Sequence, residues 1–178
     1  MTVDEFLAAY QAGKRNFQGI VLERADLFDC DIRSCDLSRA QLQGAYLPYA
    51  KLSRARLTQA NLKGANIGNA FLQAADLSAA DLQGALLSFV NLRGAILHKA
   101  NLYQVNLHGA DLSGADLTGA DLRLADLSRT KLSNTLFTQA DLRGVNLFRA
   151  QNVNLIGAIC DRTTIGPEGY PLENFETL

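Results

Sequence analysis

The fold is decided by a short repeated unit, seen most clearly at residues 110–122, which read ADLSGADLTGADL. A large apolar residue, nearly always Leu, recurs at every fifth position from Leu22 to Leu147, without a skip, at 26 positions. Two residues before it stands a small side chain, which is Ala in 18 of the 26 repeats. Asp or Asn precedes it directly in 16. Almost the whole chain is therefore one five-residue repeat.

A spacing of five suits neither a helix nor a flat strand. On a helix, at about 100° per residue, the leucines would be scattered around the cylinder. On a strand, successive leucines would alternate between opposite faces. The chain must instead turn by a constant angle every five residues, so that each Leu points to a common axis, which is typical of a solenoid. Ten of the 14 glycines fall two residues after a central position, which predicts a tight turn with positive φ there.

Runs such as 110–122 resemble the pentapeptide repeat proteins, and the resemblance covers roughly residues 15–165. It implies an all-β solenoid, a right-handed quadrilateral β-helix with four pentapeptides per coil and about seven coils. The chain resembles the simple, acid-poor members of the family that many cyanobacterial genomes encode. Whatever role these proteins have, the central leucines carry little of it, because they face inward.

The N-terminal residues 1–14 have the signature of a capping helix. Thr2 and Glu5 form a capping box, apolar residues follow at helical spacing, and Gly13 is a natural stop. A short helix over residues 3–12 is therefore expected to cover the first coil, since an open coil end exposes backbone groups and core side chains.

The C-terminal end departs from the repeat. The register breaks at residues 150–153 and resumes out of phase, with Leu155, Cys160 and Ile165 as the expected central residues. Residues 166–178 are expected to form a loop and a cap. The apolar residues of this cap are Leu172, Phe175 and Leu178. A coil end of this kind could alternatively form the contact of a weak homodimer.

No catalytic or metal-binding constellation stands out. His98 and His108 are expected on different faces as exposed residues. The run Asp111, Asp116, Asp121 and Asp126 points to four successive faces, so that these carboxylates cannot converge on one ion. The cysteines are expected as small core residues. The sequence therefore predicts a protein that is not an enzyme and that has no cofactor, no metal and no small-molecule substrate.

Two further features bear on location. The chain has no run of about 18 apolar residues that could span a membrane. Its first residues lack the basic and apolar regions of a signal peptide. A cytoplasmic protein without membrane contact is expected.

Large outward apolar residues gather on one side. With four repeats per coil, positions 20 apart share a face, and six of eleven such residues fall on the face centred on Leu27, Ile67, Leu87 and their equivalents. Chance would place about a quarter there, and aromatic patches of this kind favour a protein partner. The candidate partner face consists of Phe28, Tyr46, Tyr49, Leu86, Phe89 and Phe148.

Charge is also uneven along the chain. No acid occurs from Leu37 to Ala75, where five basic residues form a candidate basic belt. They are Arg39, Lys51, Arg54, Arg56 and Lys63. The belt permits weak binding to acidic partners, but the pI of about 6.1 is unlike that of a dedicated nucleic-acid binder.

The resemblance also raises an alternative function, because some pentapeptide repeat proteins bind DNA gyrase, a topoisomerase, by imitating DNA. Such mimicry needs a dense negative field. Residues 21–160 hold 14 Lys and Arg against 12 Asp and Glu. The rod would therefore have the shape of DNA but not its negative electrostatic field. The sequence therefore favours a rigid protein-binding scaffold, monomeric or weakly dimeric, over a DNA mimic.

Overall fold

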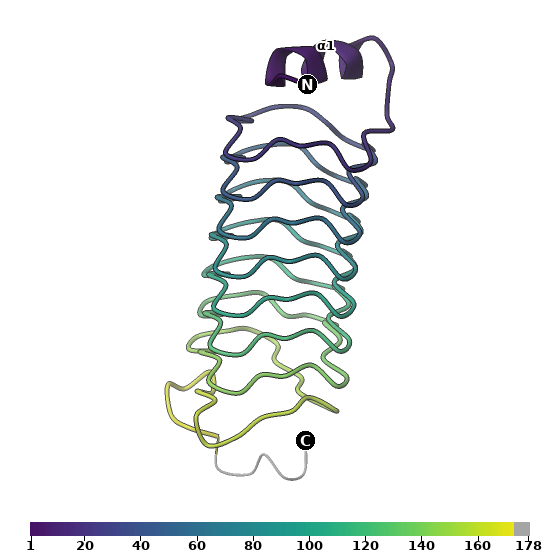
Figure 1. Ribbon diagram of the computed structural model, residues 1–178. Coiled ribbons are helices and arrows are strands. Elements are labelled where there is room, and N and C mark those ends of the chain that lie inside the picture. Colours follow the sequence, from purple (N-terminus) through teal and green to yellow (C-terminus); the bar gives the residue numbers. More distant parts are fainter. Residues whose placement is uncertain (173–178) are drawn as a thin grey trace.

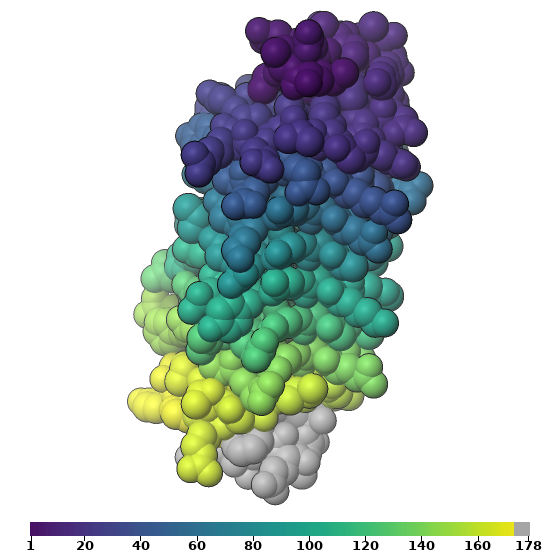
Figure 2. All heavy atoms as spheres, in the orientation of Figure 1, coloured from purple at the N-terminus to yellow at the C-terminus, as the bar shows by residue number. Residues whose placement is uncertain are grey.

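The computed structural model describes residues 1–172 of the chain. It contains one helix, α1 (Val3–Gln11), followed by a stack of similar coils (Figure 1). Figure 2 shows an elongated molecule in which the sequence runs in order from one end to the other. Within the described residues the coils are joined by isolated parallel β-bridges instead of extended strands.

These bridges establish the period of the stack. From Asn16↔Asp36 to Lys131↔Gln151, each bridge joins residues that are 20 positions apart. Four five-residue repeats therefore complete one coil, and the predicted solenoid is confirmed. Each repeat also donates backbone hydrogen bonds to the next coil, as Leu87 N does to Asn106 O at 2.7 Å. The register of the coils is thus fixed by the backbone as well as by the core.

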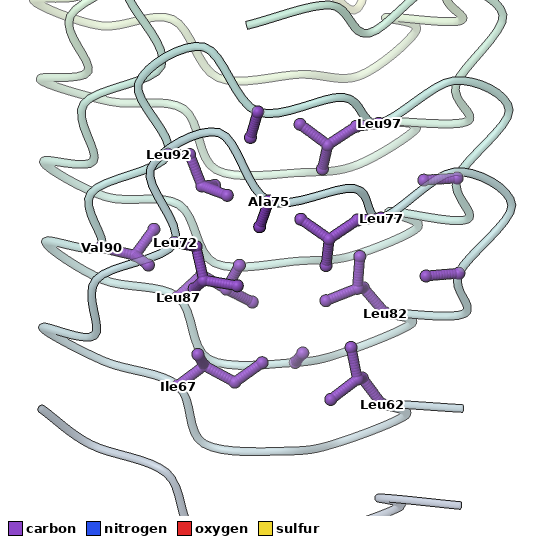
Figure 3. Packing of buried hydrophobic residues seen from close by; sticks show 14 of the residues in the cluster. Leu62, Ile67, Leu72, Ala75, Leu77, Leu82, Leu87, Val90, Leu92 and Leu97 are labelled. Carbon is purple, nitrogen blue, oxygen red and sulfur yellow. The ribbon is translucent and has the colours of Figure 1, made fainter. Parts of the chain in front are cut away.

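The four columns of central residues define four faces, named here after residues labelled in Figure 3. The Leu82 face has repeats centred on residues 22, 42, 62, 82, 102, 122 and 142, and the Leu87 face has those five positions later. The Leu92 and Leu97 faces follow in the same order. Central residues from Leu22 to Leu147 are at most 4 % exposed, and the side chains in Figure 3 point into the interior. This burial compensates for the low strand propensity of Ala, Asp, Asn and Gly.

The corner slot, two residues after each central residue, has positive φ in every repeat from Gly19 to Arg149. The turn predicted from the glycines is therefore present. Many of these corners nevertheless carry side chains, such as Ala79 at φ +54° and Phe89 at φ +58°. Within residues 1–172, nineteen non-glycine residues have positive φ, and all except Asn152 occupy this slot. Because this left-handed (αL) backbone conformation is unfavourable for L-residues, contacts between stacked coils must stabilise it at these corners.

The Asp or Asn that precedes 16 of the 26 central residues has a structural role that its polarity alone does not indicate. Asp111 Oδ1 accepts a hydrogen bond from Ser113 N at 3.0 Å, and Asn106 Oδ1 accepts one from His108 N at 3.0 Å. Burial alone would raise the pKa of Asp111, but the hydrogen bonds from Ser113 and the nearby Arg93 guanidinium together outweigh it and lower that pKa. These side chains close the corner by satisfying a backbone donor that the turn leaves unpaired.

Helix α1 covers the first coil. Its capping box is present, with Thr2 Oγ1 accepting from Glu5 N at 3.2 Å and Glu5 Oε2 accepting from Thr2 N at 2.8 Å. The helix ends at Gln11, one residue before the expected end, and Gly13 has φ +95°. Phe6 is fully buried, and its ring meets that of Phe17 edge-on at a centroid distance of 4.7 Å.

The register break shortens the last bridged coil. Asp141 pairs with Ile159 across 18 residues, and Asn146 pairs with Ile165 across 19. Ile165 therefore aligns with the outward column, and Thr164 is the fully buried residue beside it. The expected central position of Ile165 was wrong, because an additional residue is inserted after Cys160, and a strict count of five misses it.

Other parts of this end agree better with the expectation. Leu155 is buried, Cys160 aligns with Leu142 but is only half-buried, and Leu172 packs against the core. Phe175 and Leu178 lie outside the described residues. Over residues 1–172, no helix has the length and apolarity that crossing a membrane requires.

Candidate functional site

The candidate partner face lies on the Leu87 face, and all six of its residues are exposed. Their exposed fractions range from 38 % for Phe148 to 58 % for Phe89. Bridges join Asp26 to Tyr46, Tyr46 to Asn66 and Asn66 to Leu86, which places these residues in one column. The repeat dictates this arrangement, because an outward residue has no room in the leucine core.

Three of the six residues form a compact aromatic cluster near α1. The rings of Phe28 and Tyr46 stack at a centroid distance of 6.2 Å with an angle of 14°. The ring of Tyr49 meets Phe28 edge-on at 5.8 Å. Such pairs are stabilising beyond their buried area. The cluster therefore offers a partner an ordered apolar surface.

Leu86 and Phe89 form a second group two coils further along. The ring of Phe89 lies over the next coil, where a Cβ added to Gly109 would come within 2.6 Å of it. Phe89 also meets the ring of His108 edge-on at 5.5 Å, and His108 Nδ1 lies 2.8 Å from Ser128 Oγ. His108 was expected to be exposed, but these contacts leave it only partly so.

Polar residues separate the two groups, and Phe148 stands apart from both. Asn66 and Asn69 occupy the intervening coil, together with the buried Gly68. Phe148 lies 5.0 Å from the guanidinium of Arg149 and against the loop at Gly169. The six residues are thus two apolar groups and one separate aromatic, which counting along the sequence could not distinguish.

The basic belt is spread around the stack. Lys51 and Arg54 belong to the Leu92 face, Arg39 and Arg56 to the Leu97 face, and Lys63 to the Leu82 face. Lys51 Nζ pairs with Asp29 Oδ1 at 3.2 Å, and Arg39 Nε donates to Gln59 Oε1 at 3.1 Å. The five charges therefore do not form one surface, and a partner on a single face would meet only some of them.

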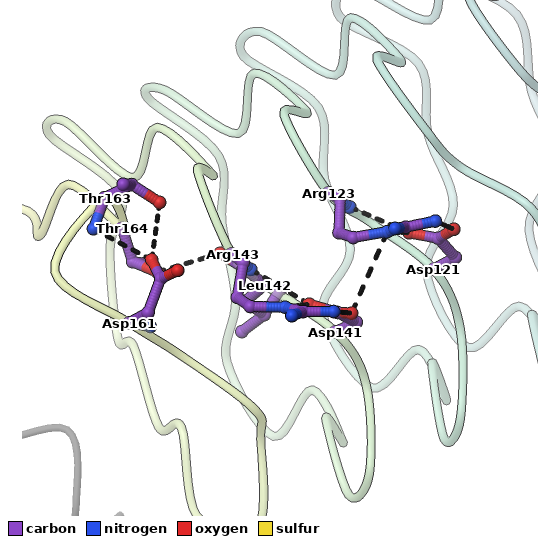
Figure 4. A network of polar contacts seen from close by, with 8 residues as sticks. All are labelled: Asp121, Arg123, Asp141, Leu142, Arg143, Asp161, Thr163 and Thr164. Carbon is purple, nitrogen blue, oxygen red and sulfur yellow. Dashed lines mark hydrogen bonds and ion pairs between the residues drawn. The ribbon is translucent and has the colours of Figure 1, made fainter.

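Carboxylates near the other end are paired with arginines on the Leu82 face (Figure 4). Arg123 binds Asp121 with two hydrogen bonds, of 2.8 and 2.6 Å, and its Nε lies 3.8 Å from Asp141 Oδ2 in the next coil. Hydrogen bonds from Arg123 lower the pKa of Asp121, and those from Arg143 lower the pKa of Asp141. This pairing weakens the negative field that the acidic repeats would otherwise produce.

Catalytic groups do not converge in the described residues. His98 Nε2 lies 2.6 Å from Asp116 Oδ2 on the Leu97 face, while His108 belongs to the Leu87 face. Over residues 1–172, no group of three or more His, Cys, Asp or Glu could hold a metal ion. Burial raises the pKa of the Cys30 and Cys35 thiols to about 12. These thiols are therefore protonated at neutral pH and poor nucleophiles.

Three exposed apolar residues near the C-terminal end were missed by sequence reasoning. Ile156, Ile159 and Tyr170 are 72 %, 49 % and 74 % exposed. They follow the register break, where the repeat no longer indicates which side chains face outward. The register break itself could have indicated these residues, because it marks the end of the solenoid, where no further coil covers apolar side chains.

Comparison with known proteins agrees with this architecture. The family described as pentapeptide repeats matches the chain in eight copies. The matches fall in five overlapping ranges, residues 14–40, 35–73, 72–109, 85–123 and 120–159. No curated protein sequence matches significantly.

Solved structures of the same kind are similar. A trypsin-treated variant of QnrB1, a plasmid-mediated fluoroquinolone resistance protein, is 19 % identical with a TM-score of 0.59, and the match covers 90 % of each chain. HetL, a pentapeptide repeat protein involved in heterocyst differentiation regulation from the cyanobacterium Nostoc sp. strain PCC 7120, is 30 % identical with a TM-score of 0.29. That match covers 97 % of this chain and all of HetL. The chain belongs to the pentapeptide repeat family.

Proposed function

We propose that this protein is a rigid, non-enzymatic scaffold that binds another protein through the partner face. In this proposal the chain is a right-handed four-sided β-helix of about seven coils, and acts as a monomer or as a weak homodimer through a coil end. The coils hold the face in a fixed geometry, so that little conformational entropy is lost when a partner binds.

One observation carries the proposal, namely the cluster of Phe28, Tyr46 and Tyr49. A cluster in which the ring of Phe28 contacts both Tyr46 and Tyr49 is unusual on a surface where most outward positions are polar. Aromatic residues are enriched in protein interfaces, where they dominate the binding energy. Leu86 and Phe89 extend the same face by a second apolar group.

The experiment is affinity capture from the native host, comparing three forms of the protein. The variant Tyr46→Ser/Phe89→Ser changes one residue in each apolar group of the partner face. The control Ile96→Ser/Leu136→Ser changes two residues that are 42 % and 52 % exposed on the Leu97 face. We expect the first variant to lose partners that the wild type and the control retain. Identical partners for all three forms would reject the proposal.

The charge distribution argues against DNA mimicry as the alternative. Residues 21–160 are net positive by two charges, from 14 basic and 12 acidic residues, and several carboxylates are paired with arginines. A gyrase supercoiling assay separates the two functions. No inhibition is expected at micromolar concentrations, and inhibition in that range would favour the mimic.

A further inference from the structure

A groove on the Leu92 face, beside α1, is not accounted for by the partner face. Its central hollow of about 640 Å³ is lined by Tyr10, Arg15, Arg33, Ser53 and Arg54, among others. Two smaller hollows share Arg33 with it. One, of about 420 Å³, reaches Leu7 and Cys30, and the other, of about 220 Å³, reaches Lys51 and Phe71. Together the three hollows are called the basic groove.

The charges of the basic groove are only partly neutralised. Arg33 is engaged by Asp31, with Nε–Oδ1 and Nη2–Oδ2 distances of 2.8 and 2.7 Å, and Lys51 pairs with Asp29. Within residues 1–172, Arg15 and Arg54 form no ion pair. The wall that carries Arg54 comes from the stretch 37–75, which has no acid. Two arginines therefore present charge to the groove without a carboxylate partner.

The remaining polar groups of the groove can also donate. Arg15 is held in place, since its guanidinium lies 4.0 Å from the Tyr10 ring centroid and its Nη1 donates to Tyr10 O at 2.7 Å. Ser53 Oγ donates to Gln73 Oε1 at 2.7 Å, which leaves the Gln73 amide N–H groups available. Donors and cations around one hollow favour a ligand that carries oxyanions.

We propose that the basic groove binds an acidic peptide segment of a partner protein, with carboxylates at Arg15 and Arg54 and an apolar side chain against Phe71. The inference rests on the proposed protein-binding role but not on the partner face. A peptide is favoured over a compact phosphate because Asp31, which lines the hollow at Leu7, pairs with Arg33, the residue that all three hollows share, and would repel concentrated negative charge there. The two ends, at Leu7 and Phe71, are apolar, and an extended peptide can reach past the carboxylate to both.

The test is fluorescence polarisation with a short labelled peptide of Glu and Leu, at low salt. A peptide with Gln in place of Glu reports binding that does not need carboxylates, and pyrophosphate serves as a competitor. The wild type is expected to bind the Glu peptide, with weaker binding to the Gln peptide and little competition by pyrophosphate.

Two arginines at equivalent corner slots provide a matched pair of variants. Arg54 and Arg39 both have positive φ, at +61° and +59°, and both are exposed, but only Arg54 lines the groove. We expect Arg54→Gln to weaken binding of the Glu peptide about tenfold, as for a lost charge-assisted hydrogen bond, and Arg39→Gln to change it less than about twofold. Equal losses in the two variants would indicate nonspecific attraction and overturn the proposal.

Two further outcomes of the peptide-binding experiment would also decide whether the basic groove binds an acidic peptide. Absence of binding to the Glu peptide, or displacement of that peptide by pyrophosphate at lower concentration than by unlabelled peptide, would overturn the proposal. The variant Tyr46→Ser/Phe89→Ser should bind the peptide like the wild type. A failure of the groove is thereby distinguished from a failure of the partner face, which affects capture of host proteins but not of this peptide.

Discussion

Exchanging Gly and Ala at the corner slot is expected to change stability in the direction opposite to that in ordinary strands. Gly64 has φ +63°, and a Cβ added there meets nothing within 4 Å, so that Gly64→Ala introduces backbone strain without a clash. Ala79 has φ +54° and is exposed, so that Ala79→Gly removes the same strain without losing core contacts.

The magnitude follows from two opposing terms. Left-handed backbone costs an L-residue roughly 1–2 kcal/mol relative to Gly. The unfolded chain is less flexible with Ala than with Gly, and this difference stabilises the folded state with Ala by about 0.4–1 kcal/mol, which offsets part of that cost. Gly64→Ala should therefore lower the free energy of unfolding by about 0.5–1 kcal/mol, and Ala79→Gly should raise it by a similar amount.

Thermal unfolding followed by circular dichroism measures both changes. For a chain of this length, 1 kcal/mol corresponds to a shift in Tm of about 2–4 °C. If strand propensity or unfolded-state entropy dominated, both variants would shift in the reverse direction, because Gly would then be the unfavourable residue. A lower Tm for Ala79→Gly together with a higher one for Gly64→Ala would refute the reasoning.

Three further predictions concern the core, the partner face and the paired carboxylates. Leu87→Asp should cost more than about 4 kcal/mol because it buries an unpaired charge, and cooperative unfolding at the wild-type temperature would contradict the inward position of Leu87. Gly109→Ala should cost about as much as Gly64→Ala, since the exposed Phe89 ring can swing away, but the NMR signals of the neighbouring His108 should shift as the ring leaves. Folding lowers the pKa of Asp141, so that the unfolded chain binds a proton at this carboxylate before the folded chain does as pH falls. Asp141 should therefore add its full contribution to the free energy of unfolding above about pH 5 and lose it toward lower pH. Urea titrations at several pH values should show this loss, and the free energy of unfolding of Asp141→Asn should depend less on pH.

Much of the architecture could be predicted from the sequence because one physical requirement repeats. Each central Leu must be buried, and only a turn of constant angle every five residues achieves this, so that the inward column and the glycine corners follow directly. The capping box at Thr2 and Glu5 was predictable for a similar reason, since its two hydrogen bonds are local.

What the sequence did not indicate depends on neighbours in adjacent coils. The αL backbone of Ala79 and Phe89 contradicts their own propensities, and only the stack enforces it. The basic groove combines Arg15, Arg33 and Arg54, which lie 18 and 21 residues apart along the chain, with the helix that lies beside them. Ile165 was misplaced because an insertion after the register break is invisible to a count of five.

The 20-residue spacing of the bridges has a consequence for how such a molecule can be altered. Insertion of one whole coil would lengthen the rod by about 4.8 Å and leave every downstream side chain on its original side. Insertion of a single pentapeptide would instead rotate everything downstream by a quarter turn. Placed between Tyr49 and Leu86, it would move Phe89 out of line with Tyr46 while keeping the leucine interior continuous. Length and orientation are thus separate, stepwise variables in this fold, and a surface assembled along one side can be dismantled without touching any residue that forms it.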